Sequence, residues 1–418
     1  MSIINDTTTA NPREQRGVAL ATNRKIGKTE RGWVVPSQRG DGKYTVALDL
    51  SRCTCPDHEL RKTKCKHIFA VEYAIQQEAE PQPAAKPERT ARAAKPRKAT
   101  YRQNWPAYNA AQTGEKTTFQ VLLHDLCKGI QQPARTVGKA PGGRTPLSYA
   151  DMVFSAVFKV YATVSARRFI SDLSDAHAKG YISKLPHFNS ILNYLELPEL
   201  TPLLHTLIQR SSLPLKAVEC DFAVDASGFS TCRTVTWFNA RYGHEQDNHD
   251  WLKVHLMCGV KTNIVTSVEI TGRYAHDGPQ FPALIQATAK NFNVAEVSAD
   301  KGYSSVANLR AAEAIGARSY IPFKSNTTGA GGGCALWRKM WHFYNFNRDE
   351  FLTHYHKRSN VETTFAMIKG KFGSHLRSKG DTAQINEILC KVLCHNLCVL
   401  IHSMHELGID PGMGAIAR

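Results

Sequence analysis

Between residues 217 and 405 the sequence alternates short apolar runs with segments of helical periodicity, and no other feature constrains the fold as strongly. Apolar runs of strand length predict five strands, at residues 218–226, 251–260, 264–271, 294–299 and 318–323. Apolar spacing near 3.6 predicts four helices, at residues 279–291, 304–315, 359–372 and 383–405. This order indicates an α/β fold in which helices flank a mixed sheet.

Residues 81–103 divide the chain. They include seven basic residues, four prolines and one acid, and they lack Val, Ile, Leu, Phe, Met and Trp. Such a segment cannot bury enough apolar surface to offset its chain entropy, so we expect an extended basic linker over residues 79–115. Two interpretations stay open, a plain spacer and a basic arm that follows DNA phosphates.

The segments on either side of the linker differ in character. The expected order is a disordered N-terminus at residues 1–30, a compact module at 31–78, the linker, a helical segment at 116–215, the α/β domain at 216–405 and a tail at 406–418. In the module, Asp41-Gly42 between two β-rich runs predicts a hairpin. In the helical segment, helices are expected at residues 118–130, 147–161, 165–178 and 186–195.

The net charge indicates a polyanionic partner. The 418 residues include 53 Lys+Arg and 36 Asp+Glu, a net charge of +17, and we expect the partner to be nucleic acid. The most apolar stretch, at residues 388–404, is interrupted by Lys391 and His395, so no membrane partner is expected. An intracellular, cytoplasmic protein follows, and its eleven cysteines are then expected to be thiols or metal ligands.

Three thiols and one imidazole in the small module are spaced as metal ligands. Cys53 and Cys55 follow the expected hairpin, and Cys65 and His67 open a helix. This set suits a closed tetrahedral Zn²⁺ site, which would supply much of the stability of so small a module. His58 is an alternative ligand. The spacing C-x-C-x9-C-x-H resembles the SWIM zinc finger, and this resemblance implies a module that binds DNA or protein.

Two acids follow apolar strands of the α/β domain. Asp225 ends the run at 218–224, and Asp300 ends the run at 294–299. An acid in such a place is unfavourable unless it lies at a sheet edge or binds a cation, so two acids on neighbouring strands could share a metal ion. Each could also be a helix cap or turn former. For Asp277 the same two interpretations stay open, a helix cap or an accessory acid near the metal.

A third acid lies in a regular polar pattern. Tyr355, Arg358 and Lys369 lie at offsets of −7, −4 and +7 from Glu362. These offsets fall near one face of a helix. A polar stripe is usually a solvated face, but a solvated face does not require so strict a register.

Read as Y-x2-R-x3-E-x6-K, these four residues resemble the YREK signature of DDE transposases of bacterial insertion sequences. Further motifs follow in the order typical of that family, namely VDASG at 224–228, WLKVHL at 251–256, HDG at 276–278, ADKGYSS at 299–305 and YIPFK at 320–324. The resemblance covers about residues 217–404. The acids are 75 and 62 residues apart, which leaves room for only a short insertion, at residues 325–347.

The resemblance implies a ribonuclease-H-like sheet with Asp225 on its first strand, Asp300 at the end of its fourth and Glu362 on a later helix. It also implies that these three acids are catalytic and hold two Mg²⁺ or Mn²⁺ ions. DNA contacts are implied for the other three signature residues, Tyr355, Arg358 and Lys369.

The function expected from the resemblance is that of a bacterial DNA transposase associated with the nucleoid. Such an enzyme binds the terminal inverted repeats of an insertion sequence, cleaves the DNA at the element ends and joins the 3′-hydroxyls to target DNA, as a homodimer or higher oligomer. Two alternatives stay open, a domesticated DNA-binding protein without strand transfer and a metal-dependent DNA nuclease.

Overall fold

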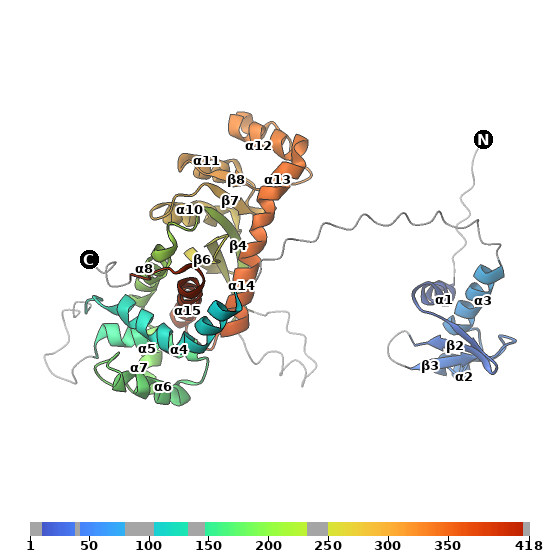
Figure 1. Ribbon diagram of the computed structural model, residues 1–418. Helices are drawn as coiled ribbons and strands as arrows, with labels where there is room; N and C mark the ends of the chain where they lie inside the picture. The colour runs from blue at the N-terminus through green and yellow to red at the C-terminus, as the bar shows by residue number, and fades with distance from the viewer. Residues whose placement is uncertain (1–10, 38–41, 80–103, 133–146, 232–249, 413–418) are drawn as a thin grey trace. The chain divides into compact units, whose positions relative to one another are not determined.

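The computed structural model describes residues 11–37, 42–79, 104–132, 147–231 and 250–412 (Figure 1). The chain forms two compact units, Met1–Tyr101 and Arg102–Arg418, and each is described by itself. The basic segment at residues 81–103, the centre of the expected linker, lies outside the described residues.

The smaller unit is a three-stranded antiparallel sheet covered by helices. Its strands β1 (Gly27–Thr29), β2 (Gly32–Pro36) and β3 (Lys43–Val46) pair in the order β1-β2-β3. Its helices are α1 (Pro12–Asn23), α2 (Pro56–Arg61) and α3 (Lys66–Ala79). The expected pairing of the runs on either side of Asp41-Gly42 is present between β2 and β3.

The expectation of disorder through residue 30 is wrong for α1. Asn11 caps this helix by accepting a hydrogen bond from the backbone N–H of Arg13, and Leu20 is buried in the core. The helix packs tightly on α3 at Gly17, where an added Cβ would lie 2.6 Å from the Cβ of Phe69. The docking surface is more than 40 residues away in the sequence, and the sparse apolar pattern of α1 does not show it.

The larger unit begins with five helices, α4 (Trp105–Cys127), α5 (Tyr149–Ala162), α6 (Ala166–Ala178), α7 (Phe188–Leu195) and α8 (Leu200–Ser212). The first of these starts within the range expected for the linker, so the boundary drawn at residue 115 is too late. Asn104 caps α4 by accepting a hydrogen bond from the backbone N–H of Ala107, and Ala111 is fully buried.

A five-stranded mixed sheet follows. Its strands are β4 (Asp221–Ser230), β5 (Trp251–Gly259), β6 (Val265–Gly272), β7 (Glu296–Ala299) and β8 (Arg318–Tyr320). They lie in the order β6-β5-β4-β7-β8, with β4, β5 and β6 antiparallel and β7 and β8 parallel to β4. The expected α/β class, a mixed sheet flanked by helices, is confirmed.

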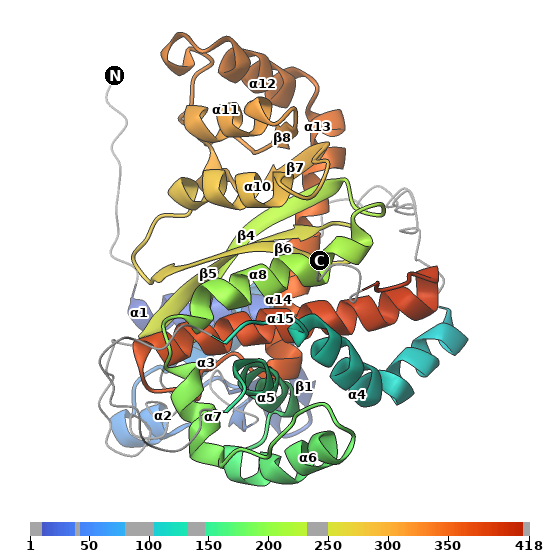
Figure 2. The same cartoon turned by 90° about the vertical axis from the view of Figure 1, so that its left-hand side faces the viewer.

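Helices cover both faces of this sheet. They are α8 and, later in the chain, α10 (Phe281–Ala289), α11 (Val306–Ala314), α13 (Arg348–Tyr355), α14 (Ser359–Phe372) and α15 (Asp381–Leu407), whereas α12 (Ala335–Phe346) packs on α11 and α13. Figure 2 shows the sheet between α10 on one side and α8 and α15 on the other. Because side chains alternate along a strand, Phe222 and Val224 pack in one core while Ala223 packs in the other.

The helix α15 is long and apolar enough to cross a membrane by length and composition alone. Within the protein, however, 83% of its most apolar window is buried, because α15 packs against α4, α5 and α8. It is therefore the central helix of the larger core.

Candidate catalytic centre and zinc cluster

The smaller unit brings together the four ligands predicted from the sequence. The side chains of Cys53, Cys55, Cys65 and His67 are buried, and their ligand atoms all lie within 4.8 Å of one another. The Sγ atoms of Cys53 and Cys65 each lie 3.9 Å from Nδ1 of His67. These separations are close to those between ligands that surround one tetrahedral Zn²⁺ ion at about 2.0–2.3 Å.

Local structure explains why the ligands converge. The backbone of Cys53 pairs with Val46 of β3 in a single antiparallel β-bridge. Cys55 is the N-cap of α2, and Cys65 precedes α3. A hydrogen bond between the two thiols lowers the pKa of Cys65 and raises that of Cys53. His58, the alternative ligand, is not in the cluster, because its Nδ1 donates to the carbonyl of Thr63 at 2.8 Å.

The two strand acids of the larger unit lie on adjacent parallel strands. The register pairs Val224 of β4 with Ala299 of β7, so Asp225 and Asp300 are the next residues of the two strands. Asp300 directly follows β7, as expected. Asp225 is not at a strand end, because β4 continues to Ser230 by pairing with β5. Within the described chain, neither carboxylate caps a helix.

The third acid reaches the same place from α14. Glu362 lies in the first turn of this helix, and a single guanidinium connects it to β4. Nη1 of Arg358 lies 2.5 Å from Oδ2 of Asp225, while Nη2 of Arg358 pairs with Oε1 of Glu362. Burial raises the pKa of Asp225, an effect that the charges of Asp300 and Glu362 reinforce and that of Arg358 opposes. The structure thus pairs Asp225 and Glu362 with one guanidinium, and Asp300 lies at the end of the strand next to that of Asp225.

The other signature residues lie along the same surface. Lys369 donates to Oγ of Ser227 at 2.6 Å, and its ammonium lies 5.1 Å from the ring centroid of Phe229. Burial lowers the pKa of Lys369. Tyr355 ends α13, with the guanidinium of Arg358 6.0 Å from its ring centroid.

A charged network that the sequence did not predict anchors this helical segment to the sheet. Nζ of Lys357 lies 2.7 Å from both Oδ2 of Asp221 and Oε2 of Glu296. Nδ1 of His354 lies 2.8 Å from the same oxygen of Glu296. Lys357 precedes Arg358, so the network positions the residue that joins the acids. His354 and Lys357 are far in the sequence from Asp221 and Glu296. In the sequence alone, each of the four looks like an ordinary surface residue.

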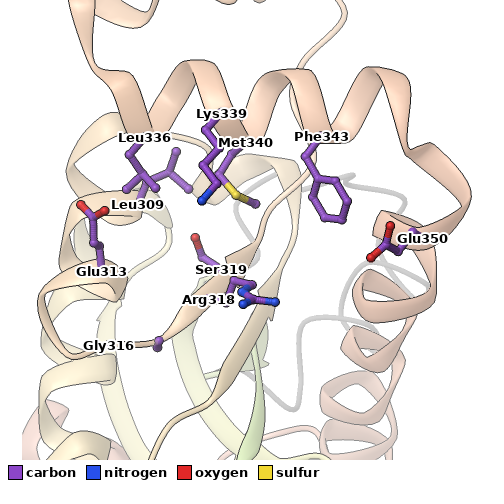
Figure 3. A pocket seen from close by; sticks show the side chains of 11 residues that line it. Leu309, Glu313, Gly316, Arg318, Ser319, Leu336, Lys339, Met340, Phe343 and Glu350 are labelled. Carbon is purple, nitrogen blue, oxygen red and sulfur yellow. The ribbon is translucent and has the colours of Figure 1, made fainter.

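A separate cavity of about 460 Å³ lies on the far side of β8, lined by other residues. In Figure 3, Leu336, Lys339 and Met340 of α12 point toward Arg318 and Ser319 of β8. The segment at 325–347, expected to be a short insertion, therefore includes the helix α12, which packs against α11 and α13 and faces β8 across this cavity.

The fold and the three acids define an α/β domain with a carboxylate centre. Two family models name its class: residues 216–397 match the transposase DDE domain, and residues 44–76 match the SWIM zinc finger. The chain is therefore a transposase-domain protein with an N-terminal SWIM zinc finger, as its motifs predicted. Its four clustered Cys and His residues are the zinc-binding set of that finger.

Other comparisons add little. No protein with a curated description matches the sequence. The chain is similar to a solved structure of the piggyBac transposase, a cryo-EM synaptic complex with hairpin DNA, at 10% identity and a TM-score of 0.34. The match covers 75% of this chain and 78% of that one.

Proposed function

We propose that the protein is a DNA transposase that binds the terminal inverted repeats of a bacterial insertion sequence, hydrolyses the phosphodiester at the element ends and transfers the 3′-hydroxyls to target DNA. One observation carries the proposal: within a transposase DDE domain, Asp225, Asp300 and Glu362 converge from two strands and a helix.

The chemistry of the donor set fits divalent cations. Carboxylate oxygens are hard ligands that suit Mg²⁺ or Mn²⁺, and the guanidinium between two of the carboxylates marks the site as one that attracts positive charge. Asp225, Asp300 and Glu362 would hold the ions. When bound, two such ions supply activation of the attacking water or 3′-hydroxyl and stabilisation of the leaving oxygen.

Positively charged residues would bind the DNA. Arg358 can pair with a phosphate through two hydrogen bonds, whereas Lys369 offers a point charge and Tyr355 an aromatic face. The helical segment at 116–215 is proposed to bind the element ends, and the net charge of +17 supports a polyanionic partner. We propose a homodimer or higher oligomer on DNA, in the bacterial cytoplasm.

The test is cleavage of labelled terminal-repeat DNA in Mg²⁺, with binding measured on the same samples. Glu362→Gln keeps the shape of the side chain but removes one negative charge, so cleavage should fall by at least about 100-fold while DNA binding survives. Asp225→Asn and Asp300→Asn should behave alike, and double variants should lose little more. Glu350→Gln, on an exposed position of α13, is the matched control.

Two results would replace the proposal. Wild-type protein that binds the ends but never cleaves them would indicate a domesticated DNA-binding protein. Cleavage without joining of 3′ ends to target DNA would indicate a nuclease. Undiminished cleavage by Glu362→Gln would place the catalytic acid elsewhere in the chain.

A further inference from the structure

A fourth acid, Asp277, lies beside the three signature acids. It precedes the short helical turn Gly278–Gln280, yet in the described structure its side chain makes no capping hydrogen bond there. Instead, Oδ1 of Asp277 lies 2.6 Å from Nζ of Lys253 on β5. Lys253 also donates to the carbonyl of Ala275 at 3.1 Å, which holds the ion pair in place. Helix capping therefore does not explain this acid.

The second oxygen of Asp277 faces the catalytic centre. A Cβ added to Gly302 would lie 3.7 Å from Oδ2 of Asp277 and 4.0 Å from Oδ2 of Asp300. Both carboxylates thus lie on the side of Gly302 toward which a side chain would project, in the turn that follows β7. The two acids therefore lie close to one another at this turn.

A buried hydroxyl group lies at the same place. Tyr303 is 1% exposed, and its hydroxyl has no hydrogen-bond partner among the described residues. Burial raises the pKa of Tyr303, and the negative charges of Asp277, Asp225 and Asp300 reinforce this rise. A buried hydroxyl group without a hydrogen-bond partner is unfavourable, so a polar ligand such as a water molecule is expected to bind it.

We propose that Asp277 and Tyr303 are positioning residues that hold the water ligands of a hydrated divalent cation bound at Asp300. The inference rests on the proposed function, because that function requires the cation. Mg²⁺ and Mn²⁺ are expected to keep several water ligands when carboxylates bind them, and those waters need acceptors and donors in a second layer. Asp277 suits this role, since Lys253 already pairs with Oδ1 and leaves Oδ2 to accept from a water.

The experiment measures Mn²⁺ binding to the full-length, zinc-loaded protein in the absence of DNA, by calorimetry or electron paramagnetic resonance. Asp277→Asn should weaken Mn²⁺ binding by about 10- to 100-fold, the usual effect of losing a second-layer partner. Tyr303→Phe removes only the hydroxyl and should weaken binding at least about threefold. Glu313→Gln, an exposed acid on α11, should leave the affinity unchanged.

Lys253→Met separates this role from a purely structural ion pair. If Asp277 merely pairs with Lys253, then Lys253→Met and Asp277→Asn remove the same contact and should change Mn²⁺ affinity in the same direction. If Asp277 holds metal-bound water, Lys253→Met removes a competing cation and should tighten Mn²⁺ binding while Asp277→Asn weakens it. Effects in the same direction would overturn the inference.

Asp225→Asn tests the proposed function separately from the role of Asp277 and Tyr303. If Asp225→Asn loses Mn²⁺ binding while Asp277→Asn and Tyr303→Phe bind as wild type, the inference is wrong and the proposed function stands. If the wild-type protein itself binds no Mn²⁺, both are wrong. Thermal unfolding of each variant in chelator shows that the changes in affinity do not come from misfolding.

Discussion

The guanidinium of Arg358 lies between Asp225 and Glu362, a place that the sequence pattern did not suggest. The signature implied a DNA contact for this residue. One planar guanidinium cannot pair with both carboxylates and with a phosphate through the same N–H groups at once. If Arg358 binds DNA, it must leave the acids, and the acids then need another source of positive charge. Under the proposed function, cation binding and DNA binding would therefore be coupled through this side chain.

Arg358→Lys tests the need for a planar, two-pronged cation. A lysine is a point charge and cannot connect both acids or bind a phosphate through two hydrogen bonds, so we expect end cleavage to fall at least about tenfold. The measurement is cleavage at saturating Mg²⁺ and DNA, compared with the thermal unfolding of each sample. Arg348→Lys, on an exposed residue of α13, is the control. Full activity of Arg358→Lys would remove the argument for bidentate contacts.

At the scale of secondary structure elements, one amide joins the helical core to the sheet. Asn396 of α15 accepts from the N–H of Val265 at 2.9 Å and donates to its carbonyl at 2.7 Å. The same amide donates to Oγ of Ser211 on α8 at 3.0 Å. Because β6 is an edge strand, these backbone groups would otherwise lack a partner, and Asn396 takes the place of a neighbouring strand.

Asn396→Ala should therefore be strongly destabilising. It leaves a buried N–H and a buried carbonyl without partners, and each such group costs about 1–3 kcal/mol. We expect the free energy of unfolding of the larger unit to fall by about 2–5 kcal/mol in urea titrations. Asn193→Ala, on an exposed position of α7, should change it by less than about 0.5 kcal/mol. A similar small change for Asn396→Ala would contradict this account.

The ion pairs of Glu296 with Lys357 and His354 make the free energy of unfolding depend on pH. Burial alone would raise the pKa of Glu296, but hydrogen bonds from Lys357 and His354 outweigh it and lower the pKa below the usual 4.5. The folded pKa lies below the unfolded one, so the network stabilises the protein above about pH 4.5 and this contribution is lost as the pH falls further.

Glu296→Gln should reduce stability by about 1–3 kcal/mol at pH 7 and progressively less below about pH 4.5, where the wild-type protein loses the same contribution. Urea unfolding between pH 3.5 and pH 7, chosen from that window, measures the difference. Glu350→Gln should follow the wild-type curve. A constant difference between Glu296→Gln and wild type across the range would show that the carboxylate charge is not what stabilises the network.

At the scale of the whole molecule, the two units depend on different sources of stability. The larger unit has two extensive apolar cores. Among its described residues, the core of the smaller unit has ten buried residues, and three of them are the cysteines of the zinc cluster. Structural Zn²⁺ in small modules binds with an apparent free energy of about 10–16 kcal/mol, which is as large as the stability of a typical domain.

Removal of zinc should therefore unfold only the smaller unit. After treatment with a strong chelator, residues 11–79 should lose their protease resistance, whereas residues 104–412 should keep theirs. Cys65→Ser should have the same effect without a chelator, and Cys220→Ser, in the larger unit, should not. A chelated smaller unit that resists protease like the untreated protein would show that its apolar core is sufficient.

Features that depend on neighbours in the sequence could be predicted from it. The four zinc ligands fall within 15 residues, so their spacing alone indicates a shared ion. The helix at 359–372 was predicted with its observed bounds, because apolar periodicity is a local property. The mixed sheet followed from the order of strands and helices.

Features that depend on distant partners could not be predicted. β4 extends past Asp225 to Ser230 only because β5 pairs with it. Arg358 meets an acid 133 residues away, and Asp277 pairs with Lys253 on β5 and lies near Asp300 beside Gly302. The sequence shows the same residue type whether a charged side chain lies on a solvated face or in a functional site. Its role is set by the groups that bury it and pair with it. Those groups are brought together by the packing of the two cores, since burial and charge pairing act through space rather than along the chain.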